Sequence, residues 1–274
     1  MVDMYTRPEL LVDTEWLAEH IDDPDLRVID ARAAGRYASG HIKGAINLPV
    51  ARLDDPASPV RGMPLPAARI AAMLGGMGIG NDDALVLYDD QGGLAASRLF
   101  WVLDYYGHSR ISILNGGIAR WEAKGRELTS EAPHFSPKEY KAFPNPDKIA
   151  LKSDVQERLG KPQVCLVDVR SREEYTGQMV QAARGGHIPG AVNVDWVQAI
   201  TQEASPVFKG PEDLSKIYTQ AGATKEKEVI TYCQGGVRAA HTYFVLRLLG
   251  YDRVRNYTGS WGDWGNDPSV PVEL

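Results

Sequence analysis

Residues 28–32 read Val-Ile-Asp-Ala-Arg, and residues 166–170 read Leu-Val-Asp-Val-Arg. The segment Gly-His-Ile-Lys-Gly-Ala-Ile-Asn at residues 40–47 likewise returns as Gly-His-Ile-Pro-Gly-Ala-Val-Asn at residues 186–193. The two segments follow each other in the same order both times, with a longer stretch between them in the second copy. An internal repeat of this length predicts two copies of one fold in a single chain.

The repeat continues toward the C-terminus. Residues 88–93 match residues 231–236, and the same spacing relates three later pairs: Gly107 with Gly250, Gly116 with Gly259, and Trp121 with Trp264. Residues 131–148, between the copies, contain several prolines and little apolar periodicity, which is typical of a linker. We therefore expect a first domain at residues 1–130, a linker at residues 131–148 and a second domain at residues 149–274.

Each copy alternates short apolar runs with stretches of helical pattern. The candidate strands are residues 27–30, 85–88, 164–167 and 229–232, and the candidate helices include residues 15–21, 69–74 and one that a capping box at Ser153 would open. Strands that alternate with helices predict parallel pairing, with helices on both faces of the sheet. The expected fold class is α/β, with a mainly parallel sheet in each of two tandem domains.

Composition narrows the possible functions. The chain has 274 residues, of which 43% are hydrophobic and 24% charged, a balance typical of a globular protein. A formal net charge of -6 offers no basic excess for nucleic acid or an anionic membrane. Cys165 and Cys233 give neither a disulfide framework nor a zinc-ligand spacing. With no signal peptide or membrane-spanning run, we expect a cytoplasmic protein without metal or other cofactor.

One cysteine occupies a place typical of a functional residue. Functional loops of parallel sheets lie at the carboxyl ends of strands, and Cys233 directly follows the apolar run at residues 229–232. A helical pattern at residues 239–249 ends at Gly250. The loop between strand and helix contains Gln234, Gly235, Gly236, Val237 and Arg238. Loop N–H groups, the positive end of the helix dipole and the arginine would together favour a nucleophilic thiolate.

Together these motifs resemble the tandem-domain rhodanese family of thiosulfate and 3-mercaptopyruvate sulfurtransferases. The matching parts are residues 168–170, residues 186–191, the Cys233 loop and residues 257–264, so the resemblance covers nearly the whole chain. It implies two rhodanese-like domains. It also implies a Cys233 persulfide that takes sulfur from a small-molecule donor, without a cofactor. The acceptor would be cyanide, a small thiol or a protein dithiol, for example in a thioredoxin-like protein.

The sequence departs from the family pattern at two positions, and its first copy lacks the cysteine. Thr258 stands where the family usually has an acidic residue, and Asp263 where it has Glu; we expect no functional consequence.

The repeat aligns Asp90 with Cys233, and Ala95 with Arg238. We therefore expect a catalytically silent first domain that closes the active site at the domain interface.

The donor is predicted from arginines near the cysteine. Relatives that use mercaptopyruvate have an arginine where this chain has Glu174, so that anchor is missing. Arg184 could match a second family arginine that holds the donor. Arg238 could bind the thiosulfate dianion, or it could pair with Asp168 and only shape the loop. These comparisons favour thiosulfate as donor, with mercaptopyruvate as the alternative.

Other side chains are expected to be structural. Cys165 lies in an apolar run and is expected in the core. His41 and His187 occur in both copies, which favours a role in the turn, and His241 is expected on a helix surface. Trp261 has no counterpart in the first copy and is a candidate to line the pocket.

Two other function classes use a similar loop. Phosphatases and arsenate reductases of this fold have five residues between the cysteine and the arginine. Here only residues 234–237 separate them, which leaves too little room for phosphate. A non-catalytic protein that binds or carries sulfur for a partner stays open.

Overall fold

The computed structural model describes residues 4–274, and it contains two five-stranded sheets whose strands are all parallel. The first sheet has the order β1-β5-β4-β2-β3 and the second the order β6-β10-β9-β7-β8. The strands of the first sheet are β1 (Leu11–Val12), β2 (Leu26–Asp30), β3 (Ile46–Asn47), β4 (Ala84–Tyr88) and β5 (Ile111–Leu114). Those of the second are β6 (Ile149–Ala150), β7 (Val164–Asp168), β8 (Val192–Asn193), β9 (Glu228–Tyr232) and β10 (Val254–Tyr257). The expected fold class is confirmed.

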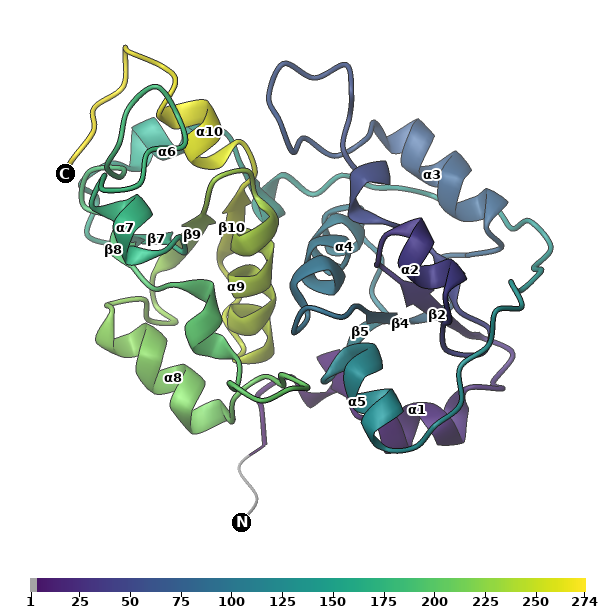
Figure 1. Ribbon diagram of the computed structural model, residues 1–274. Coiled ribbons are helices and arrows are strands. Elements are labelled where there is room, and N and C mark those ends of the chain that lie inside the picture. The colour runs from purple at the N-terminus through teal and green to yellow at the C-terminus, as the bar shows by residue number, and fades with distance from the viewer. Residues whose placement is uncertain (1–3) are drawn as a thin grey trace.

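Helices follow the strands in both halves (Figure 1). The first half contains α1 (Thr14–His20), α2 (Ala34–Ala38), α3 (Ala67–Gly76), α4 (Leu94–Tyr105) and α5 (Gly117–Ala123). The second contains α6 (Lys152–Arg158), α7 (Arg172–Tyr175), α8 (Pro211–Gln220), α9 (Val237–Leu248) and α10 (Ser260–Trp264). Short 3-10 helices are η1 (Pro8–Leu10), η2 (Val50–Arg52), η3 (Pro146–Lys148) and η4 (Trp196–Ala199). Within residues 4–274, no helix combines the length and the apolar character needed to cross a membrane.

Both faces of each sheet are covered because alternate residues of a strand point to opposite sides. In the first sheet, Ile29 and Leu87 pack in an apolar cluster with α3 and α4, whereas Val28 and Val86 pack with α1 and α5. The second sheet repeats this pattern, with α8 and α9 on one face and α6 and α10 on the other. The carboxyl ends of the strands are thereby left for the loops.

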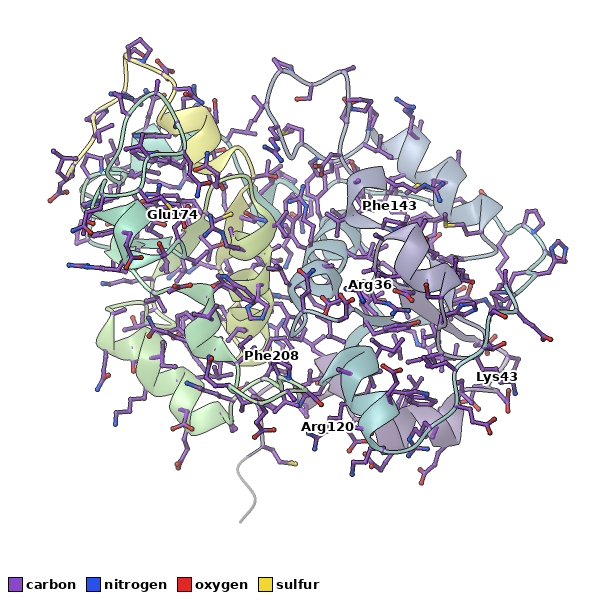
Figure 2. The ribbon with its side chains drawn as sticks, in the orientation of Figure 1. Arg36, Lys43, Arg120, Phe143, Glu174 and Phe208 are labelled. Carbon is purple, nitrogen blue, oxygen red and sulfur yellow. The ribbon has the colours of Figure 1, made fainter. Side chains whose placement is uncertain are left out.

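The two domains meet along α4 and α9, which lie side by side between the sheets (Figure 1). The rings of Phe100 and Phe244 contact edge to face, with centroids 4.9 Å apart. Phe208 lies between the domains (Figure 2), and its N–H donates to Oδ1 of Asn115 at 3.0 Å. The interface therefore joins both domains through an apolar core that they share.

Residues 131–145, all of which the structure describes, form no helix or strand before η3, as the prolines of this segment predict. It is nevertheless held on the first domain. Lys138 pairs with Asp83 at 2.7 Å, and the Asn145 N–H donates to the Tyr105 carbonyl at 2.8 Å. The exact borders at residues 130/131 and 148/149 stay predictions, and residues 1–3 lie outside the described residues.

The predicted strands agree with the observed ones to within one residue at each end. The capping box at Ser153 was a wrong prediction. The N-cap is Leu151, two residues earlier, and α6 begins at Lys152; the Leu151 N–H donates to the Asp154 carboxylate at 2.8 Å. Ser153 thus lies inside the first turn, where its side chain is not the cap.

Candidate active site

Cys233 is the first residue after β9, and its sulfur lies at the start of α9. Its Sγ accepts a hydrogen bond from the N–H of Gly236 at 3.1 Å. Gly236 is the N-cap of α9 and has φ 83°. A Cβ at this position would lie 2.7 Å from the carbonyl oxygen of Thr258. The turn therefore requires glycine both because φ is positive and because a side chain would not fit. The sulfur therefore faces the end of the helix that stabilises anions.

The other side of the loop is held by the start of α10. The Cys233 N–H donates to Oγ of Ser260 at 3.1 Å, and the Trp261 N–H donates to the Cys233 carbonyl at 2.9 Å. Ser260 has φ 54°, a left-handed conformation that is unfavourable for serine. Its hydroxyl also donates to the Tyr257 carbonyl at 2.7 Å, which holds it there. These bonds fix the backbone around Cys233, whose exposed fraction is 2%.

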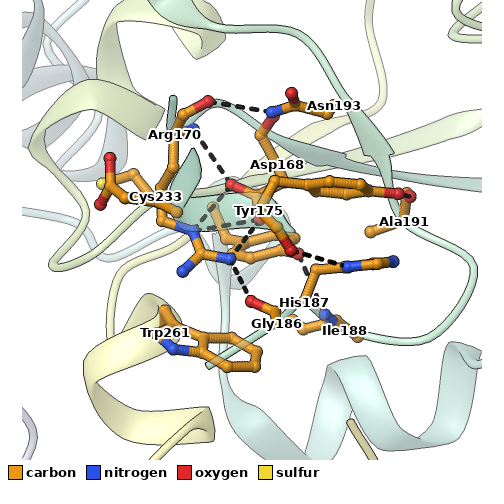
Figure 3. A network of polar contacts seen from close by, with 12 residues as sticks. Asp168, Arg170, Tyr175, Gly186, His187, Ile188, Ala191, Asn193, Cys233 and Trp261 are labelled. Atoms are coloured by element: carbon orange, nitrogen blue, oxygen red, sulfur yellow. Dashed lines mark hydrogen bonds and ion pairs between the residues drawn. The ribbon is translucent and has the colours of Figure 1, made fainter. Parts of the chain in front are cut away.

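Behind the loop, Asp168 and Arg170 form a buried ion pair (Figure 3). The guanidinium contacts both carboxylate oxygens, donates to the Gly186 carbonyl at 2.7 Å and lies over the ring of Trp261. The first domain repeats this arrangement with Asp30, Arg32 and the Gly40 carbonyl. An arrangement present in both domains is structural. It also leaves Asp168 paired with Arg170, so the expected alternative that Arg238 pairs with Asp168 is wrong.

Arg238 pairs instead with Glu174. The two nitrogens Nη1 and Nη2 contact Oε2 and Oε1 at 2.6 and 2.9 Å. Burial alone would lower the pKa of Arg238, but the hydrogen bond to Glu174 and the charges of Cys233 and Glu174 raise it. Burial opposes ionisation of Glu174 as well, yet the bond to Arg238 lowers the pKa of this carboxyl below its usual value. Glu174, the residue at the position of the missing arginine, is thus the partner that fixes Arg238.

The Arg184 side chain braces the C-terminal segment. Its guanidinium donates to the carbonyl oxygens of Trp264, Gly265, Asp267 and Val270. These backbone acceptors occupy most of its N–H groups, and a role of Arg184 in holding the donor stays a prediction. Sequence distance hid this role, since all of its partners come from the far end of the chain.

The first-domain loop corrects the alignment of the two copies. Tyr88 pairs in register with Asp30 as Tyr232 pairs with Asp168. The residue that follows the strand, where the second domain has Cys233, is therefore Asp89 and not Asp90. The first loop has one more residue before its helix begins. The first domain lacks the cysteine, as expected, but the residue that replaces it is Asp89, the neighbour of Asp90.

The Asp89 carboxylate lies among backbone N–H groups. Its Oδ1 accepts from Gln91 and Gly93, and its Oδ2 accepts from Ala96, each at 2.9 Å. Burial raises the pKa of Asp89, and these backbone donors oppose that rise. Asp90, in contrast, is partly exposed and lies 3.9 Å from Arg36. The strand-to-helix turn of this fold is thus built to surround one acceptor side chain with amides.

The histidines are structural. His41 and His187 stack on tyrosine rings, and the Nδ1 of each contacts a tyrosine carbonyl at 3.0 Å, which confirms the expected role in the turn. His241 is wholly buried, so its predicted place on a helix surface was wrong. Its Nε2 lies 3.2 Å from the Gly92 carbonyl of the first-domain loop, and burial lowers the pKa of His241 to about 4.

Trp261 and Cys165 are also core residues. Trp261 has no exposed surface, and its Nε1 donates to the Arg184 carbonyl at 3.1 Å, so it does not line a pocket as expected. Cys165 is 6% exposed, and burial raises the pKa of its thiol. The expected core position of Cys165 is confirmed.

A loop of the first domain reaches the cysteine loop. Gly62 has φ 81°, and a Cβ there would lie 2.9 Å from the carbonyl oxygen of Gly235. Arg98 of α4 is wholly buried and donates to Oδ1 of Asp54 at 2.8 Å, to the Gly62 carbonyl at 2.5 Å and to Oγ1 of Thr258 at 3.2 Å. Thr258, which stands where the family usually has an acidic residue, therefore joins the two domains through Arg98 and Gly62, and the sequence did not reveal this contact. The repeat aligns Arg98 with His241. A polar residue at the same position of both interface helices was the one sign in the sequence of a polar contact between the domains.

A cleft of about 710 Å³ opens beside the cysteine loop between the two domains. The first domain contributes Pro59, Val60 and Arg61 to its wall. The second contributes Gln234 of the loop, and its lining also includes Lys152, Gln181, Gly262, Asp263, Asn266, Asp267 and Pro268. The cleft gives a small molecule a route to the edge of the loop.

Comparison with known proteins agrees with this geometry. The Rhodanese-like domain matches residues 13–124 and again residues 151–267. The chain is 38% identical over 282 residues to the sulfur carrier protein TtuD of Thermus thermophilus, with 98% of each chain covered. It is 36% identical over 273 residues to a thiosulfate sulfurtransferase of Azotobacter vinelandii, with 100% of each covered. The crystal structure of SseA from Escherichia coli, a 3-mercaptopyruvate sulfotransferase, matches with a TM-score of 0.80 and 32% identity over 92% of this chain and 98% of that one. The chain therefore belongs to the rhodanese family and contains two rhodanese-like domains.

Proposed function

We propose that this protein is a sulfurtransferase that carries sulfur as a persulfide on Cys233. The observation that carries the proposal is the hydrogen bond from the Gly236 N–H to Sγ at the N-terminus of α9. Helix N-termini and backbone donors stabilise negative charge, and the thiolate and the persulfide are both anions. Relatives that span the whole chain, named as sulfurtransferases and as a sulfur carrier, support the same chemistry.

The proposed reaction has two displacement steps. The Cys233 thiolate attacks the outer sulfur of thiosulfate, a new S–S bond forms, and the old S–S bond breaks with its electron pair leaving on sulfite. An acceptor nucleophile then attacks the outer sulfur of the persulfide, and the electron pair of that S–S bond returns to Sγ. No oxidant or reductant is consumed, and the loop amides stabilise the anion at each stage.

Thiosulfate is the proposed donor, and 3-mercaptopyruvate is the second candidate. Glu174 neutralises Arg238 and stands where an anion-holding arginine would serve mercaptopyruvate, which supports thiosulfate. The relative from Azotobacter vinelandii also bears the name of a thiosulfate sulfurtransferase. The similarity to SseA, a 3-mercaptopyruvate sulfotransferase, supports 3-mercaptopyruvate as the second candidate donor.

The acceptor is proposed to be a thiophilic small molecule or a protein thiol. The relative TtuD is named a sulfur carrier protein, which supports delivery of the persulfide sulfur to another protein. A phosphatase reaction is less well supported, because a single short turn separates Cys233 from α9.

The experiment that tests the proposal is a paired steady-state assay on one preparation. Sulfite release from thiosulfate and pyruvate release from mercaptopyruvate are measured with the same acceptor and compared as kcat/KM. We expect turnover with thiosulfate at the higher kcat/KM, abolished in Cys233→Ser and retained in the control Cys165→Ser. Higher kcat/KM with mercaptopyruvate would overturn the donor, and full activity of Cys233→Ser would overturn the mechanism.

A further inference from the structure

An anionic donor needs a cation near the cysteine, and most of the nearby cations are already engaged. Their partners are acidic side chains or backbone carbonyls: Arg170 with Asp168, Arg238 with Glu174, Lys152 with Asp263 and Asp267, and Arg184 with the C-terminal carbonyls. A cation paired with a carboxylate attracts a second anion only weakly. Arg184 has no carboxylate partner, but carbonyl oxygens already occupy most of its N–H groups. The donor group must therefore be recognised by another residue or by backbone alone.

Arg61 is the cation in the cleft that has no such partner. Within residues 4–274 the Arg61 side chain forms no ion pair and no hydrogen bond, and it is exposed. It lines the cleft together with Gln234. A Cβ on Gly235 would lie 4.0 Å from both Cδ and Nε of Arg61, so the arginine side chain lies next to the cysteine loop.

The first domain holds this arginine in place. Arg61 precedes Gly62, whose carbonyl accepts hydrogen bonds at 2.5 Å from both Arg98 and Thr258. Arg98 belongs to the first domain and Thr258 to the second. The close approach of Gly62 to the Gly235 carbonyl leaves the backbone little room to move. Arg61 is therefore presented to the cleft by an anchored turn, which reduces the entropy lost when an anion binds.

We propose that Arg61 binds the anionic group of the sulfur donor, so that the domain without the cysteine completes the donor site. The proposal rests on the proposed function. The sulfonate oxygens of thiosulfate and the carboxylate of mercaptopyruvate share the chemistry that a guanidinium recognises. Arg61 is a binding residue in this account, and the sulfur chemistry stays with Cys233.

The first test measures anion recognition without turnover. In a Cys165→Ser background, Cys233 is alkylated with iodoacetate, which is an anion, and with neutral iodoacetamide. Arg61→Gln is expected to lower the ratio of the two rates by about tenfold, with the iodoacetamide rate unchanged. Arg61→Lys should restore part of the ratio, and Arg69→Gln, an exposed arginine on α3, should leave it as in the parent. An unchanged ratio in Arg61→Gln overturns the proposal.

The second test uses turnover and separates this proposal from the proposed function. Arg61→Gln should raise the KM for thiosulfate by about tenfold with kcat within about twofold, and Arg69→Gln should change neither. An effect confined to mercaptopyruvate would support anion binding by Arg61 and reassign the donor. If the parent transfers sulfur but Arg61→Gln keeps its KM for both donors, Arg61 is excluded. If the parent transfers no sulfur from either donor, the proposed function fails, and the alkylation ratio alone decides the role of Arg61.

Discussion

Asp89 of the first domain and Cys233 of the second each directly follow equivalent central strands, and the side chain of each accepts a hydrogen bond from the N-cap glycine of the next helix. The bonds measure 2.9 Å from Gly93 to Oδ1 and 3.1 Å from Gly236 to Sγ. One fold thus uses the same amide-lined turn twice, once around a carboxyl group and once around a thiol. This relationship is the physical reason to expect that the second turn stabilises an anionic sulfur.

The first prediction tests that alignment. Asp89→Ala should lower the free energy of unfolding by about 3 kcal/mol, because buried N–H groups lose their acceptor. Asp90→Ala is the matched control and should change it by less than about 0.5 kcal/mol, since Asp90 is partly exposed. Urea denaturation at neutral pH measures both. A larger loss for Asp90→Ala would show that the alignment of Asp89 with Cys233 is wrong.

The second prediction concerns the turn itself. Gly236→Ala should lower the free energy of unfolding by about 2 kcal/mol, because of its positive φ and the close Thr258 carbonyl. The displaced amide should also reduce kcat by about tenfold or more. Gly235→Ala is the control, since a Cβ there meets no atom closer than 4.0 Å. Equal effects of the two substitutions on kcat would contradict the role given to the Gly236 amide.

The third prediction concerns the ion pair that fixes Arg238. Glu174→Gln should lower the free energy of unfolding by about 2 kcal/mol at pH 7, because a hydrogen bond between charged groups is lost. The pKa of Glu174 is lowered in the folded state, so this stabilisation is present above the pKa of an unfolded glutamate. It should fade as the pH falls through the lowered value. Denaturation of the parent and the variant from pH 7 to pH 3 measures the difference, and a gap that widens in acid would contradict the assignment.

The fourth prediction concerns the buried histidine at the domain interface. Burial lowers the pKa of His241 from 6.5 to about 4, so the unfolded chain binds this proton first as the pH falls. The parent should lose about 3 kcal/mol relative to His241→Gln between pH 7 and pH 4. Urea denaturation at both pH values gives the comparison. A parallel decline of the two proteins would mean that His241 is not buried as a neutral side chain.

The sequence alone predicted the fold and the place of Cys233 between a strand and a helix, because both depend on local patterns. The repeat, the apolar strands and the glycine turn after Tyr232 are all visible within short segments. The alignment of the first loop was one residue off at Asp90, because a loop can gain a residue without disturbing the flanking glycines. The pairing of Tyr88 with Asp30, which is equivalent to that of Tyr232 with Asp168, reveals this shift.

What the sequence could not predict depends on contacts between distant segments. Glu174 meets Arg238 from another loop, and Arg98 meets Thr258 across the domain interface. Charge complementarity carries no positional signal in a single sequence, so the sequence suggested the donor or Asp168 as the partner of Arg238 and missed Glu174. The place of Arg61 beside the cysteine loop has the same origin, since it depends on how the two domains pack.

The most direct test of the central claim is a single-turnover measurement without acceptor. The protein is mixed with stoichiometric thiosulfate, trapped with iodoacetamide and digested, and the peptide that contains Cys233 is weighed by mass spectrometry. The account predicts one added sulfur atom on this peptide, an equal amount of released sulfite, and loss of the added sulfur when cyanide is supplied. Sulfite release without sulfur on Cys233, or the same added sulfur in Cys233→Ser, would contradict it.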